Sequence, residues 1–386
     1  MKILYVVGHF IPHIGGVEIL FNQYAKGMLE AGHEVRVVTS SSGGIVGHET
    51  VDGVEVWGYD WKMLFGHPLA RTKDIEEHVK WADLVHTTTF TVANPTRKAC
   101  KKYNKPSLIT IHEVLGDKWY WIESNKPKAL GYKMFEKYVC CKPYDYIHVI
   151  SEATEGDYIK FYGKRDNMRM IYNSLDSTIP EIAASSKVTF EDIFDVPKEC
   201  RRFLYFGRPG QSKGIFVLLS AIEKLNREHS DKLKNIRFCF LISNDPAKQR
   251  SIFEKRIAEN GLSDLVMIHD PVKRNDLFKV ISETDYVIVP SITEGFGFSA
   301  GEACMLHKSI IYSDGGSLPE VVFGNTLAFK NRDSDDLAEK IRSVIDKGEE
   351  AFDYIPDKDF STEKMINTFL DYYDQIAKER GINDNS

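Results

Sequence analysis

Short apolar runs alternate with helical patterns along this chain, and the whole series occurs twice. The runs show little polar alternation, which is typical of strands covered on both faces of a sheet. We expect strands in the first half at Ile3–Val7, Val35–Val38, Leu84–His86, Leu108–Ile111 and Ile147–Ile150. We expect strands in the second half at Phe203–Phe206, Phe238–Ile242, Val266–Ile268, Tyr286–Val289 and Ser309–Tyr312. Helices are predicted at Val17–Ala31, Val92–Tyr103, Lys128–Cys141, Ala153–Phe161, Gly214–Arg227, Ala247–Asn260, Asp276–Glu283 and Ser299–Leu306. Two such series predict an α/β protein with two doubly wound, Rossmann-like domains.

The length of the chain and a change of pattern near its middle also indicate two domains. At 386 residues, the chain exceeds the roughly 250–300 residues that a single core spans. Residues 177–200 lack a strand pattern and contain Pro180 and Pro197, so we place a linker there. The predicted parts are an N-terminal domain (1–176), the linker (177–200), a C-terminal domain (201–360) and a final helix (361–386) that packs back toward the N-terminal domain.

Composition excludes several classes of protein. No stretch approaches the roughly 18 apolar residues of a membrane-spanning helix, and the run Ile3–Val7 is too short for a secretory signal. The six cysteines show neither metal-ligand spacing nor a disulfide framework. We therefore expect a soluble protein of the reducing cytoplasm.

Charge is unevenly distributed along the chain. The formal net charge is −6, yet residues 97–142 contain eleven basic and four acidic side chains among many aromatic ones. A net acidic protein with one such segment is not a typical nucleic-acid binder, and we expect no nucleic-acid partner. The segment suits an anionic membrane surface, with peripheral binding on the cytoplasmic face. The candidate contacts are Lys126, Lys128, Lys133 and Lys137. The alternative is a solvated helix face above core aromatic residues.

The strongest chemical signal is the glycine-rich segment Glu294–Glu302, which reads Glu-Gly-Phe-Gly-Phe-Ser-Ala-Gly-Glu. It joins a predicted strand to a predicted helix. Glycines allow close backbone approach to a ligand, and the unpaired N–H groups of a helix N-terminus attract anions. The flanking carboxylates suit hydroxyl groups instead, and phosphate with many hydroxyls indicates a nucleotide sugar. The alternative is a buried turn in which Glu302 is an ordinary acid of the first helical turn.

Other strand-to-helix loops carry groups of the same kind, and ligands bind at such loops in doubly wound sheets. Gly15 and Gly16 precede the first helix without forming the dinucleotide fingerprint, which argues against a Rossmann dehydrogenase. His112 ends a strand, where it could bind a sugar hydroxyl or move a proton. Arg208 and Lys213 share one loop and could converge on a diphosphate. The structural alternatives are a tight turn, a buried histidine bound to a carbonyl group, and two solvated cations.

In their order and positions, these motifs resemble those of the retaining glycosyltransferases of family 4, which have the two-domain GT-B fold. The matching segments are Pro12–Glu18, Thr110–Glu113, Val149–Glu152, Ile171–Asp176, Gly207–Arg208, Lys213–Gly214, Glu294 with Glu302, Gly315–Gly316 and Pro319–Glu320. They cover nearly the whole chain. One departure is the segment 243–246, Ser-Asn-Asp-Pro, where the family usually has a glycine-rich loop.

The resemblance implies a role for each matching residue. Arg208 and Lys213 would hold the donor diphosphate, Glu294 would contact the hydroxyls of the donor sugar, and His112 would lie beside the transferring carbon. Glu302 would bind the ribose hydroxyls. The full implied donor-binding set is Gly15, Gly16, Arg208, Lys213, Glu294, Gly295, Phe296, Gly297 and Glu302.

The resemblance also implies a reaction. A hexose would pass from a UDP- or GDP-sugar to a hydroxyl of a glycan or a lipid-linked acceptor, with retention. The nucleotide sugar would be a co-substrate, with no other cofactor and no metal, since two cations and a helix dipole can offset the charge of a diphosphate. Two alternatives stay open. They are a non-catalytic nucleotide-sugar-binding protein and another GT-B activity with a small soluble acceptor.

Overall fold

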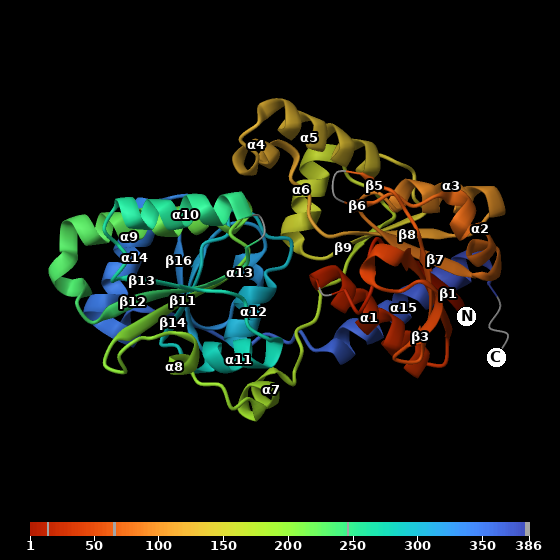
Figure 1. Cartoon of the computed structure of the whole chain (residues 1–386). Coiled ribbons are helices and arrows are strands. Elements are labelled where there is room, and N and C mark those ends of the chain that lie inside the picture. Colours follow the sequence, from red (N-terminus) through yellow and green to blue (C-terminus); the bar gives the residue numbers. More distant parts are fainter. Residues whose placement is uncertain (14, 65–66, 245–246, 383–386) are drawn as a thin grey trace. The chain divides into compact units, whose positions relative to one another are not determined.

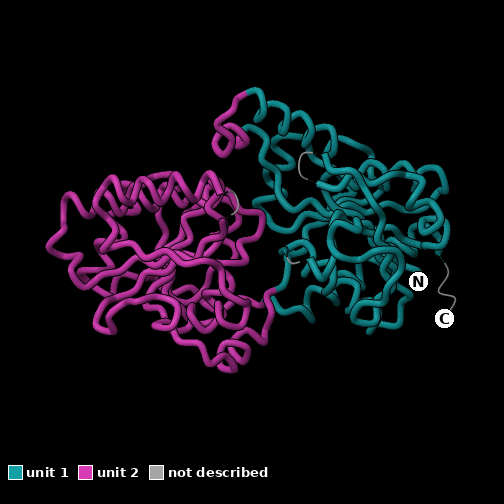
Figure 2. The backbone as a smooth tube through the Cα atoms, viewed as in Figure 1, with its two compact units in different colours: residues 1–117, 127–174, 360–386 teal, residues 118–126, 175–359 magenta. Residues whose placement is uncertain are grey.

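The structure is a computed structural model of the chain that describes residues 1–13, 15–64, 67–244 and 247–382. The chain divides into two compact units (Figures 1 and 2). Unit 1 comprises residues 1–117, 127–174 and 360–386, and unit 2 comprises residues 118–126 and 175–359. Each unit has helices packed on a largely parallel sheet, so the predicted α/β class with two Rossmann-like domains is confirmed.

Unit 1 is built on an eight-stranded sheet with the order β10-β9-β8-β7-β1-β2-β4-β3. The strands are β1 (Lys2–Val6), β2 (Glu34–Ser40), β3 (Gly47–Val51), β4 (Val54–Tyr59), β7 (Leu84–Thr88), β8 (Ser107–Ile111), β9 (Tyr146–Val149) and β10 (Met168–Met170). Neighbouring strands are parallel, apart from β3, which is antiparallel to β4. A separate hairpin consists of β5 (Met63–Leu64) and β6 (His67–Pro68). Because β1 pairs with both β2 and β7, the chain reverses its winding direction there, and ligands bind at such points.

Helices cover both faces of this sheet. They are α1 (Gly16–Glu30), α2 (Thr72–Trp81), α3 (Ala93–Tyr103), α5 (Lys126–Cys140), α6 (Glu152–Tyr162) and α15 (Thr362–Arg380), with 3-10 turns η1 (Ser41–Gly43) and η2 (Gly116–Lys118). Alternate residues of β1 enter different cores. Ile3 and Tyr5 pack with α1 and α15, whereas Leu4 and Val6 pack with α2 and α3. Two covered faces explain why this strand is an unbroken apolar run.

Unit 2 repeats the plan with a seven-stranded sheet of order β13-β12-β11-β14-β15-β16-β17. The strands are β11 (Arg201–Gly207), β12 (Ile236–Ile242), β13 (Val266–His269), β14 (Tyr286–Val289), β15 (Ser309–Ser313), β16 (Gly324–Phe329) and β17 (Asp353–Ile355). The helices are α4 (Trp119–Ile122), α7 (Ile179–Ser185), α8 (Phe190–Ile193), α9 (Ile215–His229), α10 (Ala247–Glu259), α11 (Arg274–Glu283), α12 (Phe298–Met305), α13 (Leu318–Val321) and α14 (Ser334–Lys347). The 3-10 turns are η3 (Gln211–Lys213), η4 (Ser230–Leu233) and η5 (Gly348–Ala351). The winding reverses at β11, which pairs with β12 and β14, so the loops after β11 and β14 are neighbours.

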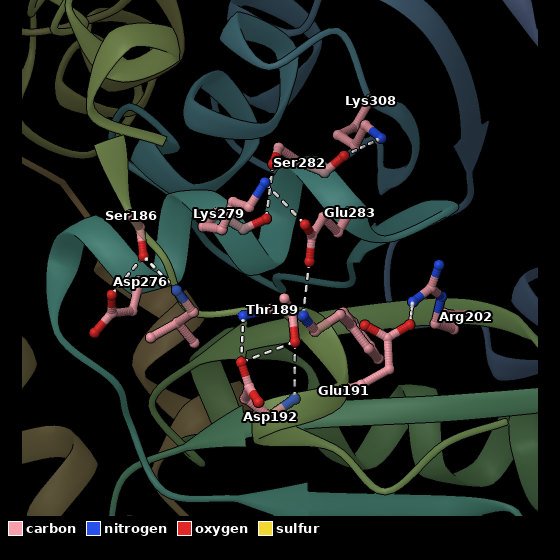
Figure 3. A network of polar contacts seen from close by, with 12 residues as sticks. Ser186, Thr189, Glu191, Asp192, Arg202, Asp276, Lys279, Ser282, Glu283 and Lys308 are labelled. Carbon is pink, nitrogen blue, oxygen red and sulfur yellow. Dashed lines mark hydrogen bonds and ion pairs between the residues drawn. The ribbon is translucent and has the colours of Figure 1, made fainter. Parts of the chain in front are cut away.

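The segment 177–200, where a linker is predicted, folds onto unit 2 and contains α7 and α8. Polar contacts fasten it to α11 (Figure 3). Ser186 Oγ donates to Asp276 Oδ1 at 2.7 Å, and the backbone N–H of Phe190 donates to Glu283 Oε2 at 2.7 Å. The segment is therefore part of the second unit.

The last helix, α15, is anchored in unit 1 by a buried chain of hydrogen bonds. His86 Nδ1 lies 2.6 Å from the Tyr373 hydroxyl, and His86 Nε2 lies 2.6 Å from Thr110 Oγ1. Thr110 Oγ1 is in turn 2.9 Å from His148 Nδ1, and His148 Nε2 is 2.8 Å from a backbone carbonyl oxygen. That carbonyl can only accept, so His148 Nε2 carries a hydrogen. The directions then follow in sequence: Thr110 donates to His148, His86 donates to Thr110, and Tyr373 donates to His86. Both imidazoles are neutral in this arrangement, and burial lowers the pKa of each, to about 4 for His148.

Candidate functional site

The loop after β11 packs directly against the loop after β14. Gly214 follows η3 with φ +66°, and a Cβ atom there would lie 1.7 Å from the carbonyl oxygen of Pro290. Only glycine permits both this conformation and this approach. Gly214 therefore allows the two loops to pack closely at the point where the sheet reverses its winding.

Lys213 and Glu294 meet across these two loops. Lys213 Nζ lies 2.5 Å from Glu294 Oε1, and Ser291 Oγ donates to the same oxygen at 3.0 Å. The Glu294 side chain is 10% exposed and that of Lys213 is 34% exposed. Among the described residues, Oε2 of Glu294 has no hydrogen-bond partner, so this oxygen is available to a ligand hydroxyl.

The backbone around Glu294 is held by a second glycine turn. A Cβ atom at Gly316 would lie 2.4 Å from the carbonyl oxygen of Glu294, and the Ser317 N–H donates to that oxygen at 3.2 Å. Gly297 has φ +96° and precedes α12 as its N-cap, with no side-chain cap. The first N–H groups of α12 therefore lack a side-chain partner from the cap residue, as an anion site requires. The Phe296 side chain is buried and lies edge-on to Phe298, which fixes the turn.

Arg208 lies in the same loop as Lys213, but the structure does not pair it with either carboxylate. Its side chain is exposed, and its carbonyl oxygen accepts a hydrogen bond from the Tyr205 hydroxyl at 2.8 Å. Within the described part of the chain, its guanidinium group makes no ion pair. Arg208 is therefore an unpaired cation, within the described residues, in the same loop as Lys213.

Glu302, the second carboxylate of the glycine-rich segment, lies largely buried on α12. Its side chain is 13% exposed and its Oε1 lies 3.4 Å from an Nη atom of Arg274. Burial raises its pKa to about 7, Arg274 opposes that rise, and Asp176 adds to it. Sequence reasoning missed Arg274, which stands 28 positions away at the start of α11 and matches no motif.

The predicted residues of unit 1 lie at the ends of β1 and β8. Gly15 is the N-cap of α1 and Gly16 its first residue, whereas Ile14 lies outside the described residues. A Cβ atom at Gly15 would lie 2.3 Å from Glu18 Oε2, so the Glu18 carboxylate covers the helix start. His13 Nδ1 is 3.3 Å from the other oxygen of Glu18.

His112 is held in one orientation. Its Nε2 lies 2.7 Å from Thr88 Oγ1, and its ring stands edge-on to Phe21. Burial, with a smaller effect of His148, lowers the pKa of His112 to about 3. His112 is therefore a neutral imidazole at physiological pH, suited to hydrogen bonding more than to carrying charge.

The predicted basic and aromatic surface separates into two parts. Lys128, Lys133 and Lys137 lie on α5 in unit 1, where Lys133 forms an ion pair with Asp117. Residues 118–126, which include Lys126, group with unit 2 instead. There the Trp121 ring lies under Arg332, whose guanidinium carbon is 4.6 Å from the ring centre. Trp121 is thus not part of the α5 face.

The segment 243–246, where the family usually has a glycine-rich loop, falls only partly within the described residues, because residues 245 and 246 lie outside them.

The helices of the described part of the chain include none with both the length and the apolar character needed to cross a lipid bilayer.

Both halves of the chain match known glycosyltransferase families. The family model for Glycosyltransferase Family 4 matches residues 14–178, and that for Glycosyl transferases group 1 matches residues 186–357. An uncharacterised glycosyltransferase of Methanocaldococcus jannaschii is 24% identical over 340 residues, which is 83% of each chain. The GDP-mannose:cellobiosyl-diphosphopolyprenol alpha-mannosyltransferase of Xanthomonas oryzae is 24% identical over 81% of this chain and 79% of its own.

Solved structures show the same fold. Sucrose-phosphate synthase of Thermosynechococcus elongatus aligns with a TM-score of 0.75 at 20% identity, covering 98% of this chain and 99% of its own. HepE of Anabaena, in complex with UDP-glucose, aligns with a TM-score of 0.73 at 16% identity, covering 97% of this chain and 100% of its own. The predicted GT-B fold is thereby confirmed.

Proposed function

The chain belongs to the group 1 glycosyltransferases with a family 4 N-terminal domain, and from this premise we propose that it is a retaining, metal-independent hexosyltransferase. The donor is a UDP- or GDP-hexose, and the acceptor is a hydroxyl group of a glycan or lipid-linked glycan. The observation that carries the proposal is the contact between Lys213 and Glu294, in loops that meet where the sheet of unit 2 reverses.

The pair can serve a diphosphate and a sugar at once. Lys213 has three N–H groups, uses one on Glu294 and is one-third exposed, which leaves donors for a diphosphate oxygen. Oε2 of Glu294 can accept from a sugar hydroxyl. Arg208 and the start of α12 supply further positive potential, so no metal ion is needed to offset the charge of the leaving group.

The proposed reaction balances without a covalent enzyme intermediate. The bond between the anomeric carbon and the diphosphate oxygen breaks, and its electron pair leaves with the nucleoside diphosphate. The acceptor oxygen bonds to the anomeric carbon on the same face, and its proton passes to the departing diphosphate. Glu294 is a poor nucleophile in this arrangement, because Lys213 and Ser291 bind its Oε1 and a remote hydroxyl of the sugar would occupy its Oε2. His112 is a neutral imidazole whose Nε2 is engaged with Thr88, so its other ring nitrogen can donate or accept one hydrogen bond.

The relatives support both classes of donor. The Xanthomonas oryzae relative is named for GDP-mannose and a polyprenol-linked acceptor, and the HepE structure contains UDP-glucose. Turnover with a panel of UDP- and GDP-hexoses tests the proposal, with release of nucleoside diphosphate as the readout. Nuclear magnetic resonance of the product should show the anomeric configuration of the donor. Nucleotide sugars that bind without any turnover would instead indicate a binding protein, and an inverted product would contradict retention.

Two variants test the assigned cations. Arg208→Ala and Lys213→Ala should each lower turnover by about 100-fold or more, because each removes a preorganised charge at the leaving group. Lys255→Ala is the control, since this lysine is 74% exposed on α10. Full activity in both site variants would remove the diphosphate assignment.

An apolar stripe on α5 supports a membrane-associated acceptor. Leu130, Met134 and Tyr138 follow one another at intervals of four, so they share one face of the helix. They are exposed by 47%, 64% and 45%. Exposed lysines lie on the same part of the helix, at positions 128 and 137. An apolar strip with nearby lysines suits an anionic bilayer surface, to which each lysine contributes about 1 kcal/mol.

Co-sedimentation with vesicles of phosphatidylglycerol tests this surface. Binding should fall as salt rises and should be lost when Lys126, Lys128, Lys133 and Lys137 become Glu. It should also weaken in Leu130→Ser/Met134→Ser, which leaves the charge unchanged. Lys248→Glu/Lys255→Glu on α10 is the control for a change of charge elsewhere, at half the size of that in the fourfold variant. If the unmodified protein ignores these vesicles at low salt, a soluble acceptor becomes the better assignment.

A further inference from the structure

The charged groups that face Glu302 come from two different elements. Arg274 approaches from α11, with an Nη atom 3.4 Å from Glu302 Oε1. Asp176 approaches from the segment before α7 and acts on Glu302 as a like charge. Asp176 is itself fixed, because its Oδ1 accepts hydrogen bonds from the N–H and the hydroxyl of Thr178 at 3.0 and 2.6 Å.

The packing of α12 forces this arrangement. A Cβ atom at Gly301 would lie 2.6 Å from the Leu175 side chain, so α12 lies flush against the segment that carries Asp176. Glu302 therefore loses water on one side and meets a fixed negative charge. Arg274 is the one cation found near it among the described residues.

Arg274 is itself held in place. Its guanidinium carbon lies 4.7 Å from the ring centre of Phe278, one helical turn further along α11. Such stacking fixes the direction of a guanidinium group. The ion pair with Arg274 is made through Oε1 of Glu302, and neither oxygen of Glu302 accepts a hydrogen bond from the described residues. The carboxylate thus lies beside a cation and can still accept hydrogen bonds from a ligand.

We propose that Arg274 is a positioning residue that keeps Glu302 an oriented carboxylate able to accept hydrogen bonds from the ribose of the donor nucleotide. The inference rests on the proposed function, which assigns the ribose to Glu302. An ionised carboxylate accepts from both ribose hydroxyls, whereas a protonated one must keep a hydrogen of its own. Without Arg274, burial and Asp176 favour the protonated form, so nucleotide affinity becomes weaker at neutral pH and recovers in alkali.

Calorimetric titration with UDP and GDP between pH 6 and pH 9 tests the proposal. In the unmodified protein, affinity should fall on acidification as Glu302 takes up a proton. In Arg274→Gln, the midpoint of that fall should move up by at least about one pH unit, because an opposite charge at this distance is worth that much. Because Glu302 of the unmodified protein titrates with a pKa of about 7, the corresponding loss of affinity at pH 7 is about fivefold, and little loss should be seen at pH 9.

Three comparisons separate this role from a structural one. Arg274→Lys keeps the charge and should return the midpoint toward that of the unmodified protein. The 2′,3′-dideoxy forms of UDP and GDP lack the ribose hydroxyls but keep the diphosphate, so their binding should not differ between Arg274→Gln and the unmodified protein. Arg227→Gln, an exposed arginine at the end of α9, is the control.

The outcomes are distinguishable. If UDP or GDP binds and Arg274→Gln leaves the midpoint unchanged, the positioning role is wrong and the proposed function stands. An equal loss for ribose and dideoxy nucleotides also refutes it. If neither nucleotide binds the unmodified protein, the proposed function fails with it. Should Arg274→Gln not fold, the titration is made with Arg274→Lys instead. The ribose and dideoxy nucleotides are also compared on the unmodified protein. If their affinities depend on pH in the same way, Arg274 does not position Glu302 for the ribose.

Discussion

Replacing Glu302 with Gln should make unit 2 more stable, although it weakens the proposed site. Folding raises the pKa of this carboxyl from its usual 4.5 to about 7, mainly through burial. The unfolded chain therefore releases this proton at lower pH than the folded chain does. The stability that the protonated group confers is fully present below pH 4.5 and is lost as the pH rises through 7.

The magnitude follows from the linkage between protonation and folding. Each tenfold change in the proton-binding constant corresponds to about 1.4 kcal/mol. The ionised carboxylate should therefore cost unit 2 about 1 kcal/mol at pH 5.5 and about 3 kcal/mol at pH 8.5. Glutamine has the same shape and no charge, so Glu302→Gln should recover that difference. Arg274 loses its partner in this variant, but at 41% exposure it can be solvated.

The protein is unfolded with denaturant at the two pH values, and unfolding is monitored by hydrogen exchange of peptides from α12. This readout measures the effect in unit 2 alone. The gain from Glu302→Gln should be larger by about 2 kcal/mol at pH 8.5 than at pH 5.5. Glu259→Gln, at an exposed position on α10, is the control. A gain that does not depend on pH, or a loss at pH 8.5, would show that burial does not hold the carboxyl in its neutral form.

Three further outcomes are expected. Tyr373→Phe leaves buried His86 Nδ1 without its partner and should destabilise unit 1 by about 1–3 kcal/mol in thermal unfolding; an unchanged melting temperature would mean that this hydrogen bond does not contribute to stability. Gly214→Ala places a methyl group against the Pro290 carbonyl and should lower turnover at least tenfold, because the two loops must separate; normal kinetics would mean that their contact is dispensable. Transfer should survive treatment with EDTA in a steady-state assay, and activity lost to EDTA and restored by magnesium would contradict the metal-independent mechanism.

The parts of the fold that follow from sequence are those buried on both faces. Every residue of β14 is buried, and its unbroken apolar run predicts the strand with correct ends. By contrast, the edge strand β3 is almost wholly exposed and its neighbour β4 alternates buried with half-buried residues, so neither shows the run expected of a central strand. Strands of this kind depend on pairing with a neighbour, which the local sequence does not encode.

The candidate site likewise contains one contact that can be predicted from sequence and one that cannot. The meeting of Lys213 and Glu294 is predictable, because each follows a strand and those strands are neighbours where the sheet reverses. The contact between Arg274 and Glu302 is not, since it joins two helices through the way α11 and α12 pack. No local pattern sets that packing, and Arg274 alone reads as an ordinary residue at the start of a helix.

The division of unit 1 into separated segments has a consequence for synthesis. Its core includes Phe369, Tyr373 and Ile376 of α15, packed against strands that leave the ribosome first. All of unit 2, by contrast, precedes residue 360. During translation the second unit can therefore close its core while the first still lacks a helix and exposes the apolar face of β1. The domain that is begun first is completed last, and a premature stop near residue 360 would leave its interior open to chaperones and proteases.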